Sequence, residues 1–254
     1  MVGPLLALAL AAQPAAAGRL PPAPRELFRI AWQRDLAGKT LGEVRPLEVG
    51  GAAHDPVTRL VVVGTRDGWL HAVREDGTVA WDFAGAGAFA GEPLVDGDTV
   101  YAGCNDGRLY AVGLTTGKER WRYEAREALG TRPALVDGLV VVASRQDTVY
   151  AVDARTGAWR WHHRREAARE GFTVQGAASV VAGGGLVHAG FSDGALVALD
   201  AATGQVRWER HAAPRGDYPD VDSLALSGGR LFAAAFSGAV VALEAATGKP
   251  VWQA

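Results

Sequence analysis

A tryptophan-ended repeat is the feature that most restricts the fold of this chain. Four of the repeats share the ending Ala-x-x-x-x-Thr-Gly-x-x-x-Trp, and the first has a version that is one residue shorter. The aligned segments are residues 61–81, 100–121, 140–161, 187–208 and 231–252. Self-similarity at a period of about forty residues indicates either a solenoid or a propeller.

Each repeat has the pattern of antiparallel strands. In each repeat an alternating run such as Leu139–Val142 is followed by a tight turn, of the Asn-Asp-Gly or Ser-Asp-Gly type, and then by a second alternating run such as Leu109–Val112. Their period of two excludes a helical solenoid. With the closing strand that carries the tryptophan, and a short first strand such as Pro133–Val136, a repeat holds four strands. The prediction is an all-β fold, a β-propeller with five full four-stranded antiparallel blades.

The repeated tryptophans and turn glycines are predicted to dock each blade on the next. A flat ring at one place in every blade is most simply a wedge between neighbouring blades, although such a ring could also stack on a ligand. The glycine supplies the positive φ that the last turn of the blade needs. The predicted blade-docking residues are Trp81, Trp121, Trp161, Trp208, Trp252, Gly117, Gly157, Gly204 and Gly248.

One strand is left over before the first repeat. The stretch Phe28–Gln33 carries Trp32 and has the character of a closing strand whose blade lacks its other strands. In closed propellers such a strand commonly completes the last blade, but here the last blade already ends in its own Trp252 strand. The sequence therefore predicts part of a longer propeller, incomplete at the C-terminus. The alternative is an unusual small ring with a spare strand.

The beginning of the chain has the pattern of an export signal. Leu5–Ala12 is an apolar run of signal-peptide length, and Ala15–Ala17 follows as a small-x-small cleavage signature. Residues 1–17 are predicted to be a signal peptide and residues 18–254 the propeller domain. No Lys or Arg precedes the run, so a misplaced start or an alanine-rich tail is the alternative. The run is too short to span a membrane.

Composition restricts the partners and cofactors. A formal net charge of −2 gives no electrostatic reason to bind nucleic acid. Cys104 is the only cysteine, so no intramolecular disulfide can form, which suits a bacterial periplasm, and we expect Cys104 to lie buried in a strand. The six histidines show no metal-ligand spacing. Neither a metal nor another cofactor is predicted.

The repeats differ in length only between one tryptophan and the next strand, so insertions are expected on a single rim of the propeller. Two of them, near residues 165–176 and 212–222, belong to consecutive blades and must be neighbours in space. Repeat proteins usually bind partners through adjacent elaborated loops on one face. The alternative is neutral variation of surface loops.

The ending Ala-x-Asp-x-x-Thr-Gly-x-x-x-Trp, complete at Ala151–Trp161 and Ala198–Trp208, resembles the pyrroloquinoline-quinone (PQQ)-like repeat family. The resemblance covers nearly the whole chain after residue 27. It implies the propeller fold more strongly than a function, since the family includes quinoprotein dehydrogenases, assembly scaffolds and sensor ectodomains.

The segments Asp220–Leu224, Gly229–Ala233 and Ser237–Leu243 are similar to the BamB family, the propeller subunits of the outer-membrane β-barrel assembly (BAM) machinery. In that family an Asp-Val-Asp segment and a Leu-x-Leu-Arg loop dock onto a POTRA domain of BamA, the central barrel protein. The resemblance implies a ring of about eight blades. The partner-binding residues that it implies here are Phe172, Val174, Gln175, Asp220 and Asp222, with glutamine at 175 where the family has arginine.

These family segments coincide with the two insertions that the repeat lengths pick out independently. The sequence therefore predicts a non-enzymatic periplasmic scaffold that docks onto BamA-type POTRA domains, with unfolded outer-membrane proteins as further partners. It would be held at the outer membrane through its partner, since no lipoprotein cysteine follows the cleavage signature. A turn or capping role is the alternative for Asp220 and Asp222.

Two other functions are weighed against this one. A sensor or scaffold propeller for another protein or ligand is the first alternative. A quinoprotein dehydrogenase is less favoured, because a single cysteine cannot supply the adjacent pair often found in those enzymes. The predicted innermost strands, such as Leu224–Leu226, are also mostly small or apolar.

Overall fold

A computed structural model describes residues 32–34, 36, 50–165, 180–212 and 219–254. The chain divides into two units, Met1–Gln33 and Arg34–Ala254, and all of the strands described lie in the second. Among the described residues there is no helix. Of the predicted N-terminal strand Phe28–Gln33, only Trp32 and Gln33 are described, and neither is in a strand.

The second unit contains five sheets of four strands, which we call blades 1 to 5 in chain order. Blade 1 comprises β1 (Ala52–Asp55), β2 (Leu60–Gly64), β3 (Trp69–Arg74) and β4 (Val79–Ala84); blade 2 comprises β5 (Leu94–Asp96), β6 (Thr99–Gly103), β7 (Arg108–Gly113) and β8 (Glu119–Glu124). Blade 3 comprises β9 (Ala134–Val136), β10 (Leu139–Ala143), β11 (Thr148–Asp153) and β12 (Trp159–Arg164). Blade 4 comprises β13 (Val181–Gly183), β14 (Leu186–Gly190), β15 (Ala195–Asp200) and β16 (Val206–His211); blade 5 comprises β17 (Val221–Ser227), β18 (Arg230–Ala235), β19 (Val240–Glu244) and β20 (Pro250–Gln253).

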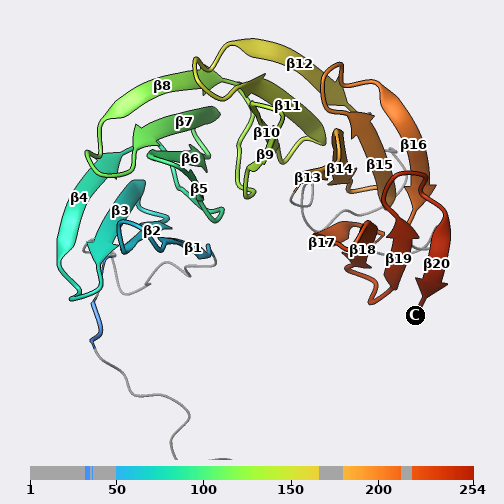
Figure 1. The fold of residues 1–254 in the computed structure, drawn as a ribbon, viewed down its shortest axis with the longest axis horizontal. Helices are drawn as coiled ribbons and strands as arrows, with labels where there is room; N and C mark the ends of the chain where they lie inside the picture. The colour runs from blue at the N-terminus through green and yellow to red at the C-terminus, as the bar shows by residue number, and fades with distance from the viewer. Residues whose placement is uncertain (1–31, 35, 37–49, 166–179, 213–218) are drawn as a thin grey trace, which may run out of the picture. The chain divides into compact units, whose positions relative to one another are not determined.

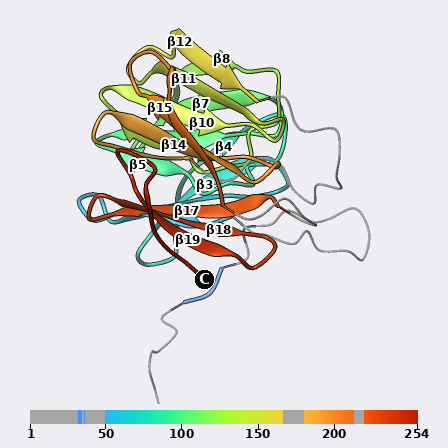
Figure 2. The same cartoon turned by 90° about the vertical axis from the view of Figure 1, so that its right-hand side faces the viewer.

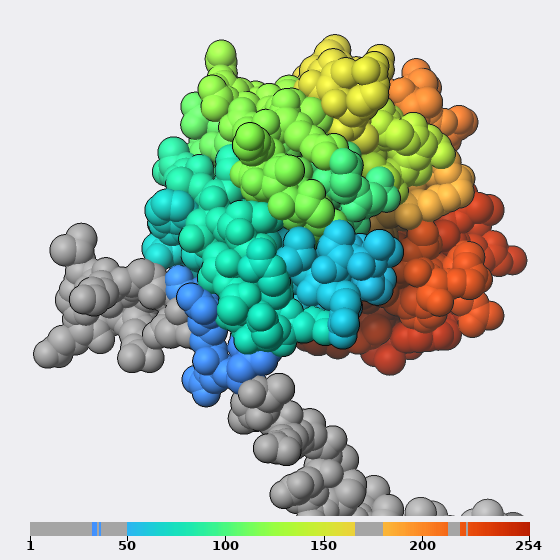
Figure 3. Space-filling view, turned by 60° about the vertical axis from the view of Figure 1, so that its left-hand side comes forward, coloured from blue at the N-terminus to red at the C-terminus, as the bar shows by residue number. Residues whose placement is uncertain are grey.

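Every blade is an antiparallel meander in which each strand pairs with its neighbours in sequence. Within the second unit the blades follow one another along an arc (Figure 1), and the view turned by 90° brings blades 4 and 5 toward the viewer (Figure 2). In the space-filling view the surfaces of blades 1 and 2 meet (Figure 3). The predicted all-β fold of four-stranded antiparallel propeller blades is confirmed.

The core lies between blades, and this explains the continuous apolar runs in the middle strands. In β10, Val141 packs in a cluster with Phe191 of blade 4, whereas Val140 packs in a cluster with Leu109 of blade 2. Successive side chains of a strand point to opposite faces of its sheet. Both faces of a middle blade are therefore covered by neighbouring blades, so successive residues of these strands are apolar, and the period of two expected from the sequence is wrong for them.

The repeated tryptophans lie at these blade junctions. The Trp161 Nε1–H donates to the carbonyl oxygen of Ala201 in the next blade at 2.8 Å. Its ring covers Gly204, where φ is +72° and a methyl group would lie 2.7 Å from Trp161 Cδ2. The same pairs occur at the other junctions, where the rings of Trp81, Trp121 and Trp208 lie against Gly117, Gly157 and Gly248 and donate to Leu114, Ala154 and Ala245. Trp252 is 43% exposed and contacts the Phe232 ring of its own blade.

Arg210 and Arg34 each lie two residues after a tryptophan and make the same kind of hydrogen bond. Arg210 Nε donates to the carbonyl oxygen of Gly248 at 3.1 Å, and Arg34 Nη1 donates to that of Gly77 at 3.0 Å. Gly77 belongs to the β3–β4 turn of blade 1, as Gly248 belongs to the β19–β20 turn of blade 5. Arg34 therefore makes the same kind of contact that Arg210 makes from the closing strand β16.

The meander gives the propeller two rims. Turns between the first and second strands and between the third and fourth strands of each blade lie on one rim, which we call the turn rim. Turns between the second and third strands lie on the other rim, together with the connections from each blade to the next. We call this second rim the insertion rim, because both long insertions belong to blade-to-blade connections.

Candidate partner-binding rim

The predicted docking loop falls in the connection between blades 3 and 4. Phe172, Val174 and Gln175 lie outside the described residues, so their part in binding stays a prediction. The residues that flank both insertions are described, and they allow the base of the candidate site to be built.

The hairpin turn Phe191–Gly194, between β14 and β15, contacts three residues that flank the two insertions. Arg165, just before the first insertion, donates from Nε to Asp193 Oδ2 at 2.6 Å. The backbone N–H of Ala212, just before the second insertion, donates to the Gly194 oxygen at 2.9 Å. The N–H of Val221, just after it, donates to the Phe191 oxygen at 3.2 Å. The two insertions therefore share a base, as their positions in consecutive blades predicted.

Arg165 forms ion pairs with two acidic side chains at this base. Besides Asp193, its guanidinium contacts Glu209 of β16, with 3.1 Å between Nη2 and Oε1, and it lies 5.9 Å from the centroid of the Phe191 ring. Its side chain is only 20% exposed. A planar guanidinium can serve two carboxylates and an aromatic face at once, which a lysine ammonium cannot do with the same geometry. Arg165 thus holds the start of the first insertion on blade 4.

Asp147 links blade 3 to the same turn. It is 4% exposed, and its carboxylate accepts hydrogen bonds from the Ser192 N–H, at 3.1 Å, and from the Ser192 hydroxyl. Burial raises the pKa of Asp147 above its ordinary value, against the bonds from Ser192, and the charges of Asp193 and Asp220 act in the same direction as burial. Carboxylates therefore outnumber cations around this turn among the described residues.

Asp220 is buried beside the second insertion. It is 3% exposed, and neither carboxylate oxygen has a hydrogen-bond partner among the residues that the structure describes. Its backbone is fixed, because the Phe236 N–H donates to the Asp220 oxygen at 2.8 Å. Leaving an ionised carboxylate buried without a donor costs free energy, and a donor or cation brought by a partner would recover it. The chemistry that this site offers is therefore a pair of acceptor oxygens on Asp220.

Asp222 lies at an irregular point of β17. The pairing of β17 with β18 shifts register between Val221 and Ser223, so Asp222 is the extra residue of a β-bulge. The backbone at Asp222 is therefore not part of a regular strand pairing. The joint action of the two carboxylates stays a prediction.

Sequence reasoning did not identify Arg165, Asp147 or Ser192 as parts of this site. The Ser-Asp-Gly sequence at 192–194 was readable as a hairpin turn, but its partners come from blade 3 and from the chain before the insertion. Repeat alignment gives equivalent positions in each blade and does not pair side chains across blades.

The described residues hold no group of three or more His, Cys, Asp or Glu side chains placed to bind a metal ion. Within the same residues, no helix is long and apolar enough to cross a membrane.

Comparison with known proteins identifies relatives of one kind. The family model of outer membrane protein assembly factor BamB matches residues 29–112 and 66–254. A BamB from Bordetella pertussis is 34% identical over 134 residues, which is 52% of this chain and 32% of that protein. A BamB from Nitrosomonas eutropha is 25% identical over 185 residues, 73% of this chain and 32% of that protein. The chain thus spans about a third of the length of these curated relatives.

Solved structures are similar in fold. The crystal structure of BamB from Moraxella catarrhalis aligns with a TM-score of 0.66 at 21% identity, over 83% of this chain and 77% of that one. A quinohemoprotein alcohol dehydrogenase from Pseudomonas putida HK5 aligns with a TM-score of 0.63 at 19% identity, over 78% and 40% of the two chains. At these identities the likeness shows the fold alone.

Proposed function

Because the chain belongs to the family of outer membrane protein assembly factor BamB, we propose that it is a non-enzymatic scaffold of outer-membrane protein assembly. Its relatives from Bordetella pertussis and Nitrosomonas eutropha carry that name. The likeness to an alcohol dehydrogenase extends only to the fold, so the proposal contains no catalytic step.

The single observation that carries the proposal is the common base of the two insertions at the turn Phe191–Gly194. A contiguous rim built from two adjacent connections can present a larger surface than either loop alone. Loops held by a rigid scaffold are a usual place for binding residues. The proposed partner-binding surface comprises the two insertions, residues 166–179 and 213–222.

The charges at this base favour a partner that brings basic side chains. Asp220 offers two acceptor oxygens without a donor among the described residues, and Arg165 is already engaged by Asp193 and Glu209. Complementary charge directs specificity and association rate, and a desolvated charge pair contributes to the lifetime of a complex. We assign the partner as a POTRA domain of the BamA barrel protein, with unfolded outer-membrane proteins as transient clients. The location that follows is the periplasmic side of the outer membrane.

A binding measurement tests this assignment. The full chain is titrated against the isolated POTRA region of BamA from the same organism by calorimetry. Asp220→Asn, which keeps the side-chain shape but removes its charge, should weaken binding by at least about tenfold. Asp96→Asn, on the exposed turn rim, is the matched control and should bind as the wild type does. Failure of a folded wild type to bind would remove the assembly proposal and favour a sensor or another scaffold role.

A further inference from the structure

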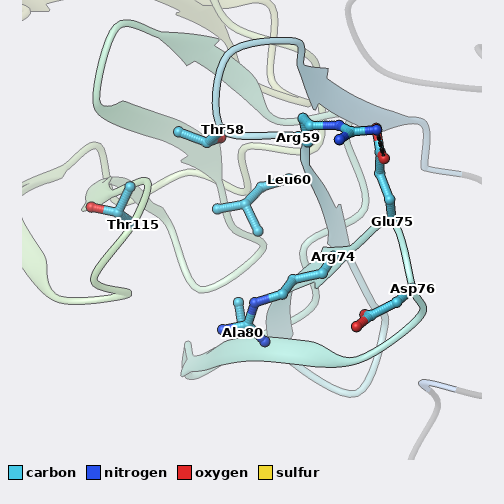
Figure 4. A pocket seen from close by; sticks show the side chains of 8 residues that line it. All are labelled: Thr58, Arg59, Leu60, Arg74, Glu75, Asp76, Ala80 and Thr115. Carbon is cyan, nitrogen blue, oxygen red and sulfur yellow. Dashed lines mark ion pairs between the residues drawn. The ribbon is translucent and has the colours of Figure 1, made fainter.

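Blade 1 carries a pocket on the turn rim, away from the insertion rim. Its volume is about 440 Å³, and it lies between the β1–β2 and β3–β4 turns of blade 1 and Thr115 of blade 2. Leu60 and Ala80 give it apolar walls, and the guanidinium of Arg74 extends within it toward Ala80 (Figure 4).

Blades 3 and 4 fill the equivalent place with an internal ion pair. In blade 3, Arg160 binds Asp153 at 2.8 Å, and in blade 4, Arg207 binds Asp200 at 2.6 Å. Each arginine directly precedes the blade tryptophan, and each aspartate ends the third strand. The hydrogen bond from Arg207, together with those from Thr203, lowers the pKa of Asp200 to about 2.

Blade 1 has one half of this pair, with the sign reversed. Arg74 ends the third strand, where blades 3 and 4 have aspartate, and Ala80 precedes Trp81, where those blades have arginine. An alanine side chain cannot fill the space of an arginine or supply a carboxylate to Arg74. The hollow and the missing counter-charge therefore have the same cause.

No described carboxylate forms an ion pair with Arg74. Its Nη1 donates to the Thr78 hydroxyl at 3.3 Å and to the Val79 carbonyl oxygen at 3.2 Å, both neutral acceptors. The two neighbouring acids have other partners. Glu75 pairs with Arg59 across the pocket. Asp76 accepts hydrogen bonds from the Thr78 N–H and hydroxyl, which lower its pKa, and the charge of Arg74 lowers this pKa further without forming an ion pair.

We propose that this pocket binds a carboxylate carried on a short apolar stem, with Arg74 as its counter-charge and Leu60 and Ala80 against the stem. A guanidinium offers two parallel donors that match the two oxygens of a carboxylate. A carboxylate here would complete the ion pair that blades 3 and 4 form internally. The group can come from a free organic acid or from an acidic side chain of a peptide, since both present the same chemistry.

Arginine-detected NMR of the full chain tests the proposal. In protein labelled with ¹⁵N-arginine, the Nε–H signal of Arg74 is assigned from its absence in Arg74→Gln. Sodium 3-methylbutanoate and the peptide acetyl-Ala-Glu-Ala-amide represent the two sources. At least one of them should shift this signal saturably, while the matched probes 3-methylbutanamide and acetyl-Ala-Gln-Ala-amide should not. The acid with the lower dissociation constant identifies the source.

Two variants make the assignment specific to the pocket. Ala80→Glu supplies an internal carboxylate to Arg74 and should weaken binding of the acid by at least about tenfold. The double variant Arg74→Asp, Ala80→Arg recreates the ion pair of blades 3 and 4, and it should fold normally while losing the site. Equal binding by wild type and Ala80→Glu, or no saturable shift with either acid, would overturn the proposal. The site lies on the rim opposite the proposed partner surface, so neither outcome bears on partner docking.

Discussion

Replacement of Gly204 by alanine should destabilise the protein through the tryptophan junction between blades 3 and 4. The added methyl group would lie 2.7 Å from Cδ2 of Trp161, a ring that is only 5% exposed. The ring cannot easily move away, because its Nε1–H is bonded to the Ala201 carbonyl oxygen at 2.8 Å.

The magnitude has two parts. Holding a residue with a Cβ at φ of +72° costs about 1–2 kcal/mol. Overpacking against a buried neighbour costs about 1–3 kcal/mol more. We therefore expect Gly204→Ala to lower the free energy of unfolding by about 2–5 kcal/mol.

Gly185→Ala in the same blade is the matched control. Gly185 has a φ of +74°, but nothing lies within 4 Å of the place a methyl group would occupy. It should lose only the backbone cost of about 1–2 kcal/mol. Urea unfolding followed by tryptophan fluorescence measures both variants. A difference between them of less than about 0.5 kcal/mol would refute the wedge at this junction.

Three further predictions concern buried and charged groups. Since burial raises the pKa of Asp147, the folded state holds the proton of this carboxyl more tightly than the unfolded state. The free energy of unfolding should therefore fall as pH rises above 3.8. Urea unfolding at a series of pH values should show a smaller fall for Asp147→Asn than for the wild type. Burial raises the pKa of Cys104 to about 12, so Ellman's reagent at about pH 8 should label this thiol quickly only in urea; fast labelling of the native protein would contradict its burial. Arg165→Lys cannot span both Asp193 and Glu209 and should lower the free energy of unfolding by about 1–2 kcal/mol, whereas the same change at the exposed turn residue Arg155 should leave it unchanged.

The blades could be predicted from the sequence because the same strand pattern occurs in each of several repeats. The run Leu139–Val142 became β10 at Leu139–Ala143, and Leu109–Val112 became β7 at Arg108–Gly113. Such agreement follows from the local origin of the signal, since apolar period, turn residues and strand length all lie within one repeat.

The candidate site was less predictable because its contacts join residues that the repeat does not align. Arg165 meets Asp193 across 28 positions of sequence. The burial of Asp220, whose side chain is 3% exposed, was not predicted from the sequence. The chain runs close there, since a methyl group on Gly194 would lie 2.9 Å from the Pro219 oxygen. A close approach between two loops leaves no sign in composition or periodicity.

The deviations from the repeat indicate where each blade can do something that its neighbours do not. The tryptophan–glycine junction recurs from blade to blade, so it accounts for stability and carries no information about a partner. Blade 1 has Arg74 and Ala80 where blades 3 and 4 have an aspartate–arginine pair, and the contacts of Arg165 belong to the turn at the base of both insertions. Because the backbone at each place is fixed by contacts common to the repeat, a change in one side chain alters binding capacity without requiring a new fold. A propeller can thus place independent sites on opposite rims, and the residues that break its repeat locate them.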